Sequence, residues 1–336
     1  MNFCERIILD NFPLISIVIA IRNEEKYIKK CLESCYNQTL SKRLYEILII
    51  DGMSNDSTLS IVNNFVEKHK NLRIKILSNT KKIQAVGWNI GIKNAKGKYI
   101  ILLSGHAYLT IDYLEKCLMF HAKYDAPCIG GVVKLVGEDN KSKSIGAAFN
   151  SIIGSGNAKY WCGTKIEYVE TLLFGMYKKE VIEEVGYIDE NLVRGEDWEL
   201  NYKIVKKFGK MLLIPEIKSF LYAKSNFKNL FKRQFIAGLW KPYIFKKHPK
   251  SILFRHLLPP IFTFATFLSI IISIILKTPT ITLSIIIPYL LVISSYSILL
   301  KIKDKSLSIT YLIISFLIIH FTYGMGLILG IFKFLF

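Results

Sequence analysis

The stretch LISIVIAIRNEE, residues 14–25, decides the fold of the first two thirds of this chain. Its apolar, largely β-branched first part ends abruptly in a polar loop, which is typical of a buried strand. Similar strands are predicted at residues 46–50, 73–77 and 98–103. Helical patterns separate these strands, at residues 27–37, 57–70 and 85–95. Strands that alternate with helices predict an α/β domain with a mostly parallel, Rossmann-like sheet.

Polar side chains follow three of these strands. They are Asn23 and Glu24, then Asp51, then Ser104 and His106. Ligands of parallel sheets bind beyond the carboxyl ends of the strands, so we expect these residues to converge on one crevice. No G-x-G-x-x-G follows the first strand and no Walker-type loop is present, which argues against dinucleotide and P-loop sites.

A second candidate cluster lies at Glu196-Asp197, ahead of a helix predicted over residues 199–207. A carboxylate at a helix start can serve as a general base for an attacking hydroxyl. Acidic residues are also common in first helical turns for dipole reasons alone. Between the two clusters, residues 138–161 have weak periodicity and predict a loop-rich segment.

The C-terminal third contains three uncharged runs, residues 257–276, 278–300 and 307–332. Each is long enough to cross a bilayer as a helix, so they predict an all-α transmembrane region over residues 256–336. Residues 226–255 precede it as a basic, amphipathic segment suited to the membrane interface. We expect residues 1–225 to form the remaining domain, which holds both polar clusters.

Charge supports a membrane location. The net charge is +19, and residues 217–255 hold ten Lys or Arg and no carboxylate. Because these cations border the apolar runs, we expect an anionic membrane surface as their partner, and no nucleic acid. Basic loops stay in the cytoplasm, and residues 1–10 do not resemble a signal peptide. This predicts a multi-pass cell-membrane protein with a cytoplasmic catalytic domain, and with Lys277 and the C-terminus outside.

Four blocks together resemble glycosyltransferase family 2, whose members have the GT-A fold. The blocks are IVIAIRNEE at 17–25, IIDGMSNDST at 49–58, GKYIILLSGH at 97–106 and the segment 174–200 that ends in GEDWEL. The resemblance extends over roughly residues 14–240, and the second and fourth blocks are most similar to the membrane-anchored succinoglycan-type glucosyltransferase branch.

The resemblance implies an inverting transferase with a nucleotide-sugar donor. Asp51 would then hold the nucleoside, and Asn23 and Glu24 would line the same pocket. On the acceptor side, Asp197 would be the general base, with Glu196 and Trp198 beside it.

Further along, Arg233, Gln234 and Trp240 stand where processive relatives carry a Gln-x-x-Arg-Trp motif. The spacing of that motif is not reproduced, which favours transfer of a single sugar over polymerisation.

The family's metal-binding Asp-x-Asp motif is replaced here by Ser104-Gly105-His106. Ser104 can still bond a ribose, and His106 can ligate a divalent Mn or Mg ion, although these ions prefer hard oxygen ligands. The alternative is that His106 is only a hydrogen-bonding loop residue. The metal requirement is therefore open at this point.

The leading hypothesis is transfer of one sugar to a lipid-linked or growing glycan at the cytoplasmic membrane face. A polyprenyl-phosphate glycosyltransferase is a close alternative. A non-catalytic nucleotide-sugar-binding scaffold is an alternative of another class, motivated by the missing Asp-x-Asp, and the Glu196-Asp197 pair argues against it.

Overall fold

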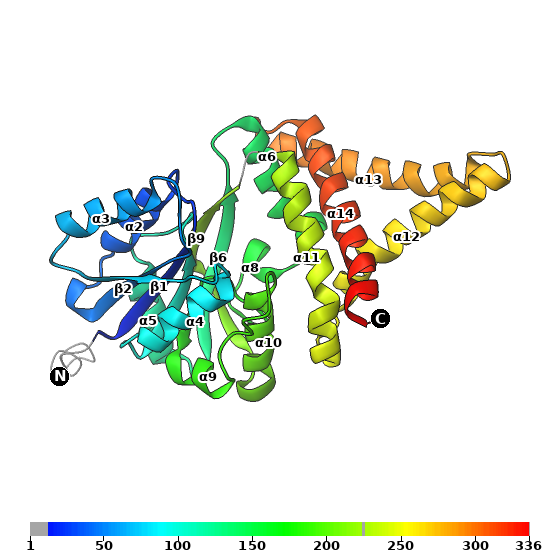
Figure 1. Cartoon of the computed structure of the whole chain (residues 1–336). Helices are drawn as coiled ribbons and strands as arrows, with labels where there is room; N and C mark the ends of the chain where they lie inside the picture. The colour runs from blue at the N-terminus through cyan, green and yellow to red at the C-terminus, as the bar shows by residue number, and fades with distance from the viewer. Residues whose placement is uncertain (1–12, 224–225, 336) are drawn as a thin grey trace. The chain divides into compact units, whose positions relative to one another are not determined.

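The computed structural model describes residues 13–223 and 226–335 of the chain. The chain divides into two compact units (Figure 1). The first unit takes residues 1–134 and 163–222, and the second takes residues 135–162 and 223–336. Each unit is described by itself below.

The first unit contains a nine-stranded sheet with the order β3-β2-β1-β4-β8-β6-β9-β5, and β7 pairs with β9. Four strands form its parallel half: β1 (Ile15–Ile21), β2 (Tyr45–Asp51), β3 (Arg73–Ser78) and β4 (Tyr99–Ser104). The sheet continues through β8 (Met176–Lys178), β6 (Cys128–Val136), β9 (Met211–Tyr222), β5 (Ala107–Leu109) and β7 (Glu167–Val169). Because β4 meets β8 antiparallel, the predicted α/β sheet is confirmed and is mixed beyond its parallel half.

Helices cover this sheet and connect its parallel strands. They are α2 (Ile28–Tyr36), α3 (Thr58–Lys68), α4 (Gln84–Asn94), α5 (Tyr113–Lys123), α9 (Lys179–Glu184) and α10 (Glu196–Phe208). β2 is buried along its whole length, as expected for a central parallel strand covered on both faces. Helix α4 approaches β1 closely, because a Cβ built on Gly91 would lie 2.2 Å from Cγ1 of Val18.

The register of the parallel strands sets the position of the candidate residues. Ile21 at the end of β1 is paired with Asp51 at the end of β2. On the other side of β1, Ala20 is paired with Ser104. The three strands therefore end side by side.

The second unit is helical, and part of it comes from the middle of the sequence. Residues 138–161 were predicted to be loop-rich, and this is wrong: the segment folds as α6 (Asn140–Phe149), α7 (Ile152–Ser155) and α8 (Lys159–Cys162). Asp139 and Ser142 form a capping box at the start of α6. The apolar partner of α6 is the helix α14, far away in the sequence, so the local pattern does not reveal the buried face.

The rest of the second unit is α11 (Phe227–Lys247), α12 (Phe254–Ile275), α13 (Thr280–Lys303) and α14 (Ile309–Leu335). The last three are long and apolar enough to cross a membrane, and the most apolar window of each has a mean hydropathy of 2.1. They coincide with the three predicted runs to within a few residues. The two units divide the chain differently from the predicted boundaries at residues 225 and 255, because residues 135–162 join the C-terminal helices.

Candidate active site

Asp51 is held in place at the carboxyl end of β2. Its side chain is only 4% exposed. The Ser54 hydroxyl donates a hydrogen bond to Oδ1 at 2.6 Å, and the Ser54 amide donates to the same carboxylate. The turn that follows β2 therefore fixes the orientation of this carboxylate.

The loop after β1 is joined to the loop after β2 by reciprocal hydrogen bonds. The backbone amide of Asn23 donates to the Ser54 hydroxyl at 3.0 Å, and the side-chain Oδ1 of Asn23 accepts from the backbone amide of Asn55 at 3.0 Å. Asn23 takes a positive φ of 53°, which asparagine tolerates better than most residues. The two loops thus form one rigid polar rim.

Glu24 and His106 form a pair across the ends of β1 and β4. Nδ1 of His106 lies 2.9 Å from Oε1 of Glu24. The amide of Glu24 donates to Thr58 at 2.8 Å, which fixes the backbone behind the carboxylate. Gly105 makes the pairing possible, because a Cβ at this position would lie 2.8 Å from Ile21 and 3.0 Å from Glu24.

The residues present at this edge do not fit a divalent metal site. No group of three or more His, Cys, Asp or Glu side chains suited to a metal occurs within residues 13–223 and 226–335. His106 is the one imidazole here, and the carboxylates of Glu24 and Asp51 are engaged by His106 and Ser54. Since Mg²⁺ and Mn²⁺ require several oxygen ligands, we derive no chemical step through a metal.

The second cluster lies where α10 begins. Gly195 precedes the helix with a φ of 86°, a left-handed conformation that glycine adopts without strain. Glu196 is 4% exposed, and its Oε2 has no hydrogen-bond partner among the described residues. Burial, and after it the neighbouring charge of Asp197, raise the pKa of Glu196 to about 7.

Asp197 lies on the face of α10 that is turned to the sheet. Asn201, one turn later on the same face, accepts a hydrogen bond from the Tyr177 hydroxyl of β8 at 2.7 Å. The charge of Asp197 also contributes to the raised pKa of buried Tyr177, whose main cause is desolvation. Oδ1 of Asp197 accepts a hydrogen bond from the backbone amide of Trp198 at 2.8 Å. The Trp198 ring stacks on the ring of Tyr202.

The other predicted acceptor-side residues lie in the second unit, on α11. The Arg233 guanidinium lies over the ring of Phe149, Gln234 is buried, and Trp240 packs on Phe334. All three have packing partners within that unit, and their contact with an acceptor remains a prediction.

The sequence analysis did not predict three features of the first unit. The Ser54 hydroxyl orients Asp51 by a hydrogen bond. The absence of a side chain at Gly105 leaves space for Glu24 to reach His106. Asn201 connects α10 to β8 by accepting a hydrogen bond from Tyr177. Ser54 belongs to the block at residues 49–58, so its spacing from Asp51 is a signal that was available. The Glu24–His106 pair joins residues 82 positions apart, so no local sequence pattern predicts it.

Comparison with known proteins gives a family match. Residues 16–186 match the family described as Glycosyl transferase family 2. Over 244 residues the chain is 35% identical to the dolichyl N-acetyl-alpha-D-glucosaminyl phosphate 3-beta-D-2,3-diacetamido-2,3-dideoxy-beta-D-glucuronosyltransferase of Methanococcus voltae, covering 71% of this chain and 76% of that protein. It is 26% identical to the succinoglycan biosynthesis protein ExoA of Rhizobium meliloti, covering 72% of this chain and 73% of that protein.

The fold also has a solved counterpart. The mannosyltransferase PcManGT from Pyrobaculum calidifontis, in complex with GDP-Man and Mn²⁺, superposes with a TM-score of 0.59. The match covers 99% of this chain and 92% of that one at 15% identity. This likeness supports the GT-A fold.

Proposed function

Because the chain belongs to glycosyl transferase family 2 and is a glycosyltransferase, we propose that it transfers one sugar, with inversion, from a nucleotide diphosphate sugar to a lipid-linked glycan. The observation that carries this proposal is the pair of polar clusters in one unit. One cluster lies at the carboxyl ends of β1, β2 and β4, and the other at the start of α10.

In the proposed reaction, an acceptor hydroxyl attacks the anomeric carbon from the face opposite the diphosphate. The new bond joins the acceptor oxygen to that carbon. The bond from the carbon to the diphosphate oxygen breaks, and its electron pair leaves with the nucleoside diphosphate. The hydroxyl proton passes to the carboxylate of Asp197, which acts as the general base.

On the donor side, we assign Asp51 to the nucleoside and Asn23 to the same pocket. The fixed orientation of Asp51 by Ser54 supports this assignment, because a pre-oriented carboxylate loses little freedom on binding. Ser104 would face the ribose. His106, whose Nδ1 lies 2.9 Å from Oε1 of Glu24, would direct its Nε2 toward the diphosphate.

The name of the Methanococcus voltae relative describes a transferase that acts on a dolichyl phosphate-linked sugar. We propose an acceptor of this class for the present chain. Three apolar helices and ten cations within residues 217–255 support a site of action at the membrane surface. Confinement to the membrane raises the effective concentration of a lipid-linked acceptor.

The experiment that tests this function supplies membranes containing the full chain with a panel of radiolabelled nucleotide sugars. Two lipids are offered separately, a bare polyprenyl phosphate and a polyprenyl phosphate that already carries a sugar. Label should enter the organic phase only with the sugar-bearing lipid. Label on the bare polyprenyl phosphate would establish the alternative transferase, and no transfer from any donor in the panel to either lipid would count against this function.

A further inference from the structure

Helices α11 and α14 contact each other from end to end. Near their starts, the rings of Phe227 and Tyr311 meet edge to face at 5.9 Å. Near their ends, Nζ of Lys246 donates to the carbonyl oxygen of Phe334 at 2.9 Å. The two helices therefore run parallel and in register, as Figure 1 shows, and must lie at the same depth relative to any membrane.

Glycines make the contact between these helices very close. A Cβ built on Gly238 of α11 would lie 2.2 Å from the carbonyl oxygen of Tyr323. A Cβ on Gly326 of α14 would lie 2.2 Å from the carbonyl oxygen of Phe235, and one on Gly330 would lie 2.3 Å from that of Leu239. Backbone-to-backbone packing at three positions leaves no room for lipid between the two helices.

Helix α11 is too polar to cross the hydrocarbon core. It carries six cations in its 21 residues, namely Lys228, Lys232, Arg233, Lys241, Lys246 and Lys247. A charged side chain at the bilayer centre is energetically costly, and α11 would have to bury several. Among the described helices, α11 is not one of the three that are apolar enough to span.

The middle of α14 also contacts polar backbone outside the apolar helices. Nε2 of His320 lies 3.1 Å from the carbonyl oxygen of Ile153 in α7, a four-residue helix capped by Ser151 and Gly156. Near the start of α14, the amide of Ser308 donates to the hydroxyl of Ser144 in α6 at 3.0 Å. Non-helical backbone and polar caps of this kind are not compatible with a lipid-exposed position in the hydrocarbon core.

We infer that α14 does not cross the membrane, and that α11 and α14 lie together along an anionic lipid surface while only α12 and α13 cross. The chain then leaves this surface in α12, returns in α13, and has its C-terminus on the same side as α11. This inference is independent of the reaction proposed above.

Burial explains how α14 can be as apolar as its neighbours and still not span. In its most apolar window α14 is 44% buried inside the protein, because α11 and α12, and to a smaller extent α6, α13 and α7, pack against it. The corresponding window of α13 is only 11% buried. Protein thus covers about four times as much of the α14 window as of the α13 window, and the apolar side chains of α13 are left for lipid to cover.

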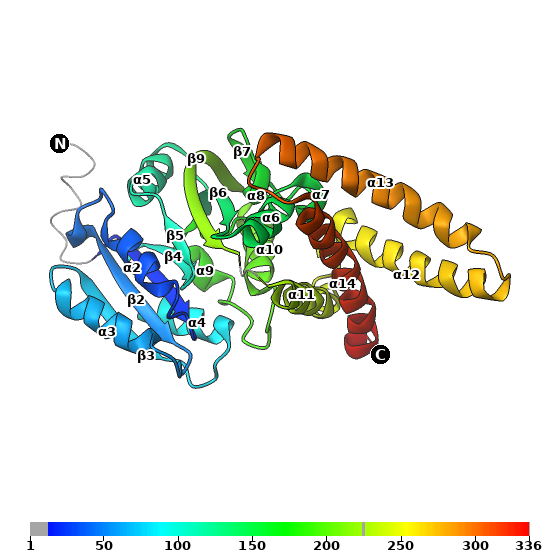
Figure 2. The same ribbon diagram turned by 90° about the horizontal axis from the view of Figure 1, so that it is seen from above.

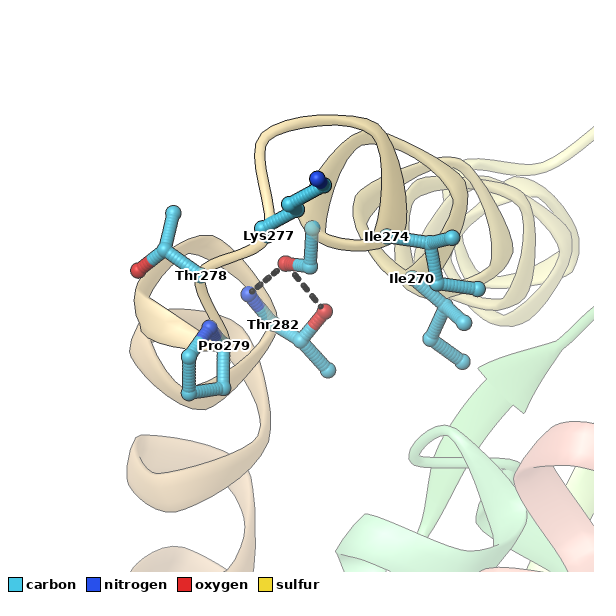
Figure 3. A pocket seen from close by; sticks show the side chains of 7 residues that line it. Ile270, Ile274, Lys277, Thr278, Pro279 and Thr282 are labelled. Carbon is cyan, nitrogen blue, oxygen red and sulfur yellow. Dashed lines mark hydrogen bonds between the residues drawn. The ribbon is translucent and has the colours of Figure 1, made fainter.

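The α12–α13 hairpin has the dimensions and the tip of a membrane-crossing pair. In Figures 1 and 2 it runs crosswise to α14. At about 1.5 Å per residue, both helices exceed the roughly 30 Å of a hydrocarbon core. The tip is polar, with Lys277 and Thr278 in the turn and Ser273 bonded to Thr282 at 2.9 Å (Figure 3). This tip is suited to emerge in the headgroups of the far leaflet.

The test uses the full chain with a single cysteine appended after Phe336. Intact cells are treated with a membrane-impermeant maleimide before and after lysis. Labelling only after lysis is expected. Labelling in intact cells would overturn the inference, because it would place the C-terminus outside, as three spans require.

Two further sites make every outcome decisive. In separate chains, paired phosphatase and fluorescent-protein reporters are inserted after Lys277 and after Lys305. The inference requires Lys277 outside and Lys305 inside, together with an internal C-terminus. If α11 also crossed, the C-terminus would still be internal but these two sites would exchange sides, which would likewise overturn the inference.

Discussion

The two polar clusters of the first unit differ in how completely their side chains are paired. At the ends of β1, β2 and β4, Asp51 is bonded to Ser54 and Glu24 to His106. At the start of α10, Oε2 of Glu196 is buried without a hydrogen-bond partner among the described residues. The first cluster is organised before any ligand arrives, whereas the second retains an unsatisfied carboxyl group.

This difference suits the two clusters to different tasks, donor recognition for the first and proton handling for the second. Preorganised groups suit recognition of a donor whose shape is constant, because little freedom is lost on binding. A buried carboxyl with a raised pKa suits proton handling, and such groups gather at sites of acid–base chemistry. Four substitutions test the contrast, from the largest expected effect to the smallest.

Asp197→Asn should lower turnover by about 10²- to 10⁴-fold, because the amide cannot accept the acceptor proton. Donor affinity should hardly change, since the donor cluster is organised without Asp197. Single-turnover transfer and equilibrium binding of the nucleotide measure the two quantities. Glu67→Gln, which removes an exposed carboxylate on α3, is the matched control. Near-normal turnover of Asp197→Asn would remove the base assignment.

Glu196→Gln should abolish a pH dependence of stability. The folded-state pKa of Glu196 is about 7, above its ordinary value of 4.5, mainly because of burial. The protonated form is thus favoured in the folded state, and the unfolding free energy falls as pH rises from 4.5 to 7, by about 3 kcal/mol.

The measurement is the unfolding midpoint of the detergent-solubilised chain at pH 5 and pH 8. Glu196→Gln should gain stability relative to wild type at pH 8 and little at pH 5, while Glu67→Gln should keep the wild-type slope. A slope that persists unchanged in Glu196→Gln would show that Glu196 is not the group responsible.

His106→Gln should weaken donor binding by roughly 10- to 100-fold, because a charge-assisted hydrogen bond contributes about 1.5–3 kcal/mol. Wild-type turnover should persist in EDTA, since the residues present do not fit a metal site. A Mn²⁺ titration of wild type and His106→Gln checks both expectations. If EDTA abolished wild-type turnover and Mn²⁺ restored it only when His106 is present, His106 would be a metal ligand.

Ser54→Ala should have the smallest effect. It removes the 2.6 Å hydrogen bond to Asp51 and leaves the Ser54 amide in place. Loss of one such bond costs about 1 kcal/mol, which corresponds to about a fivefold weaker binding of the nucleotide. Calorimetric titration measures this, with Ser60→Ala on α3 as the control. Unchanged affinity would mean that the backbone turn alone orients Asp51.

The parallel half of the sheet could be predicted from sequence because its signals are local. Each buried strand is a continuous apolar run, and the polar residues follow the strand ends directly. The pairing of Glu24 with His106 could not be predicted, since it depends on how β1 and β4 align and on the missing Cβ of Gly105.

The helices of the second unit show the limit of hydropathy as a signal. The most apolar windows of α13 and α14 have the same mean hydropathy of 2.1, yet these windows are 11% and 44% buried. Hydropathy indicates that side chains avoid water and does not distinguish lipid from protein as their cover. The prediction that residues 138–161 are loop-rich was wrong for a related reason. The apolar face of α6 packs against α14, which is distant in the sequence, and not against neighbouring residues.

The split composition of the second unit has a consequence for synthesis on the ribosome. Residues 135–162 emerge long before residues 309–335, the helix against which α6 and α7 pack. During this interval the apolar face of α6, with Ile145 and Phe149, has no native cover. A nascent chain released before α14 is made should therefore expose an apolar, aggregation-prone surface and depend on a chaperone. For the same reason, a fragment truncated at residue 225 should aggregate although it contains every strand of the sheet.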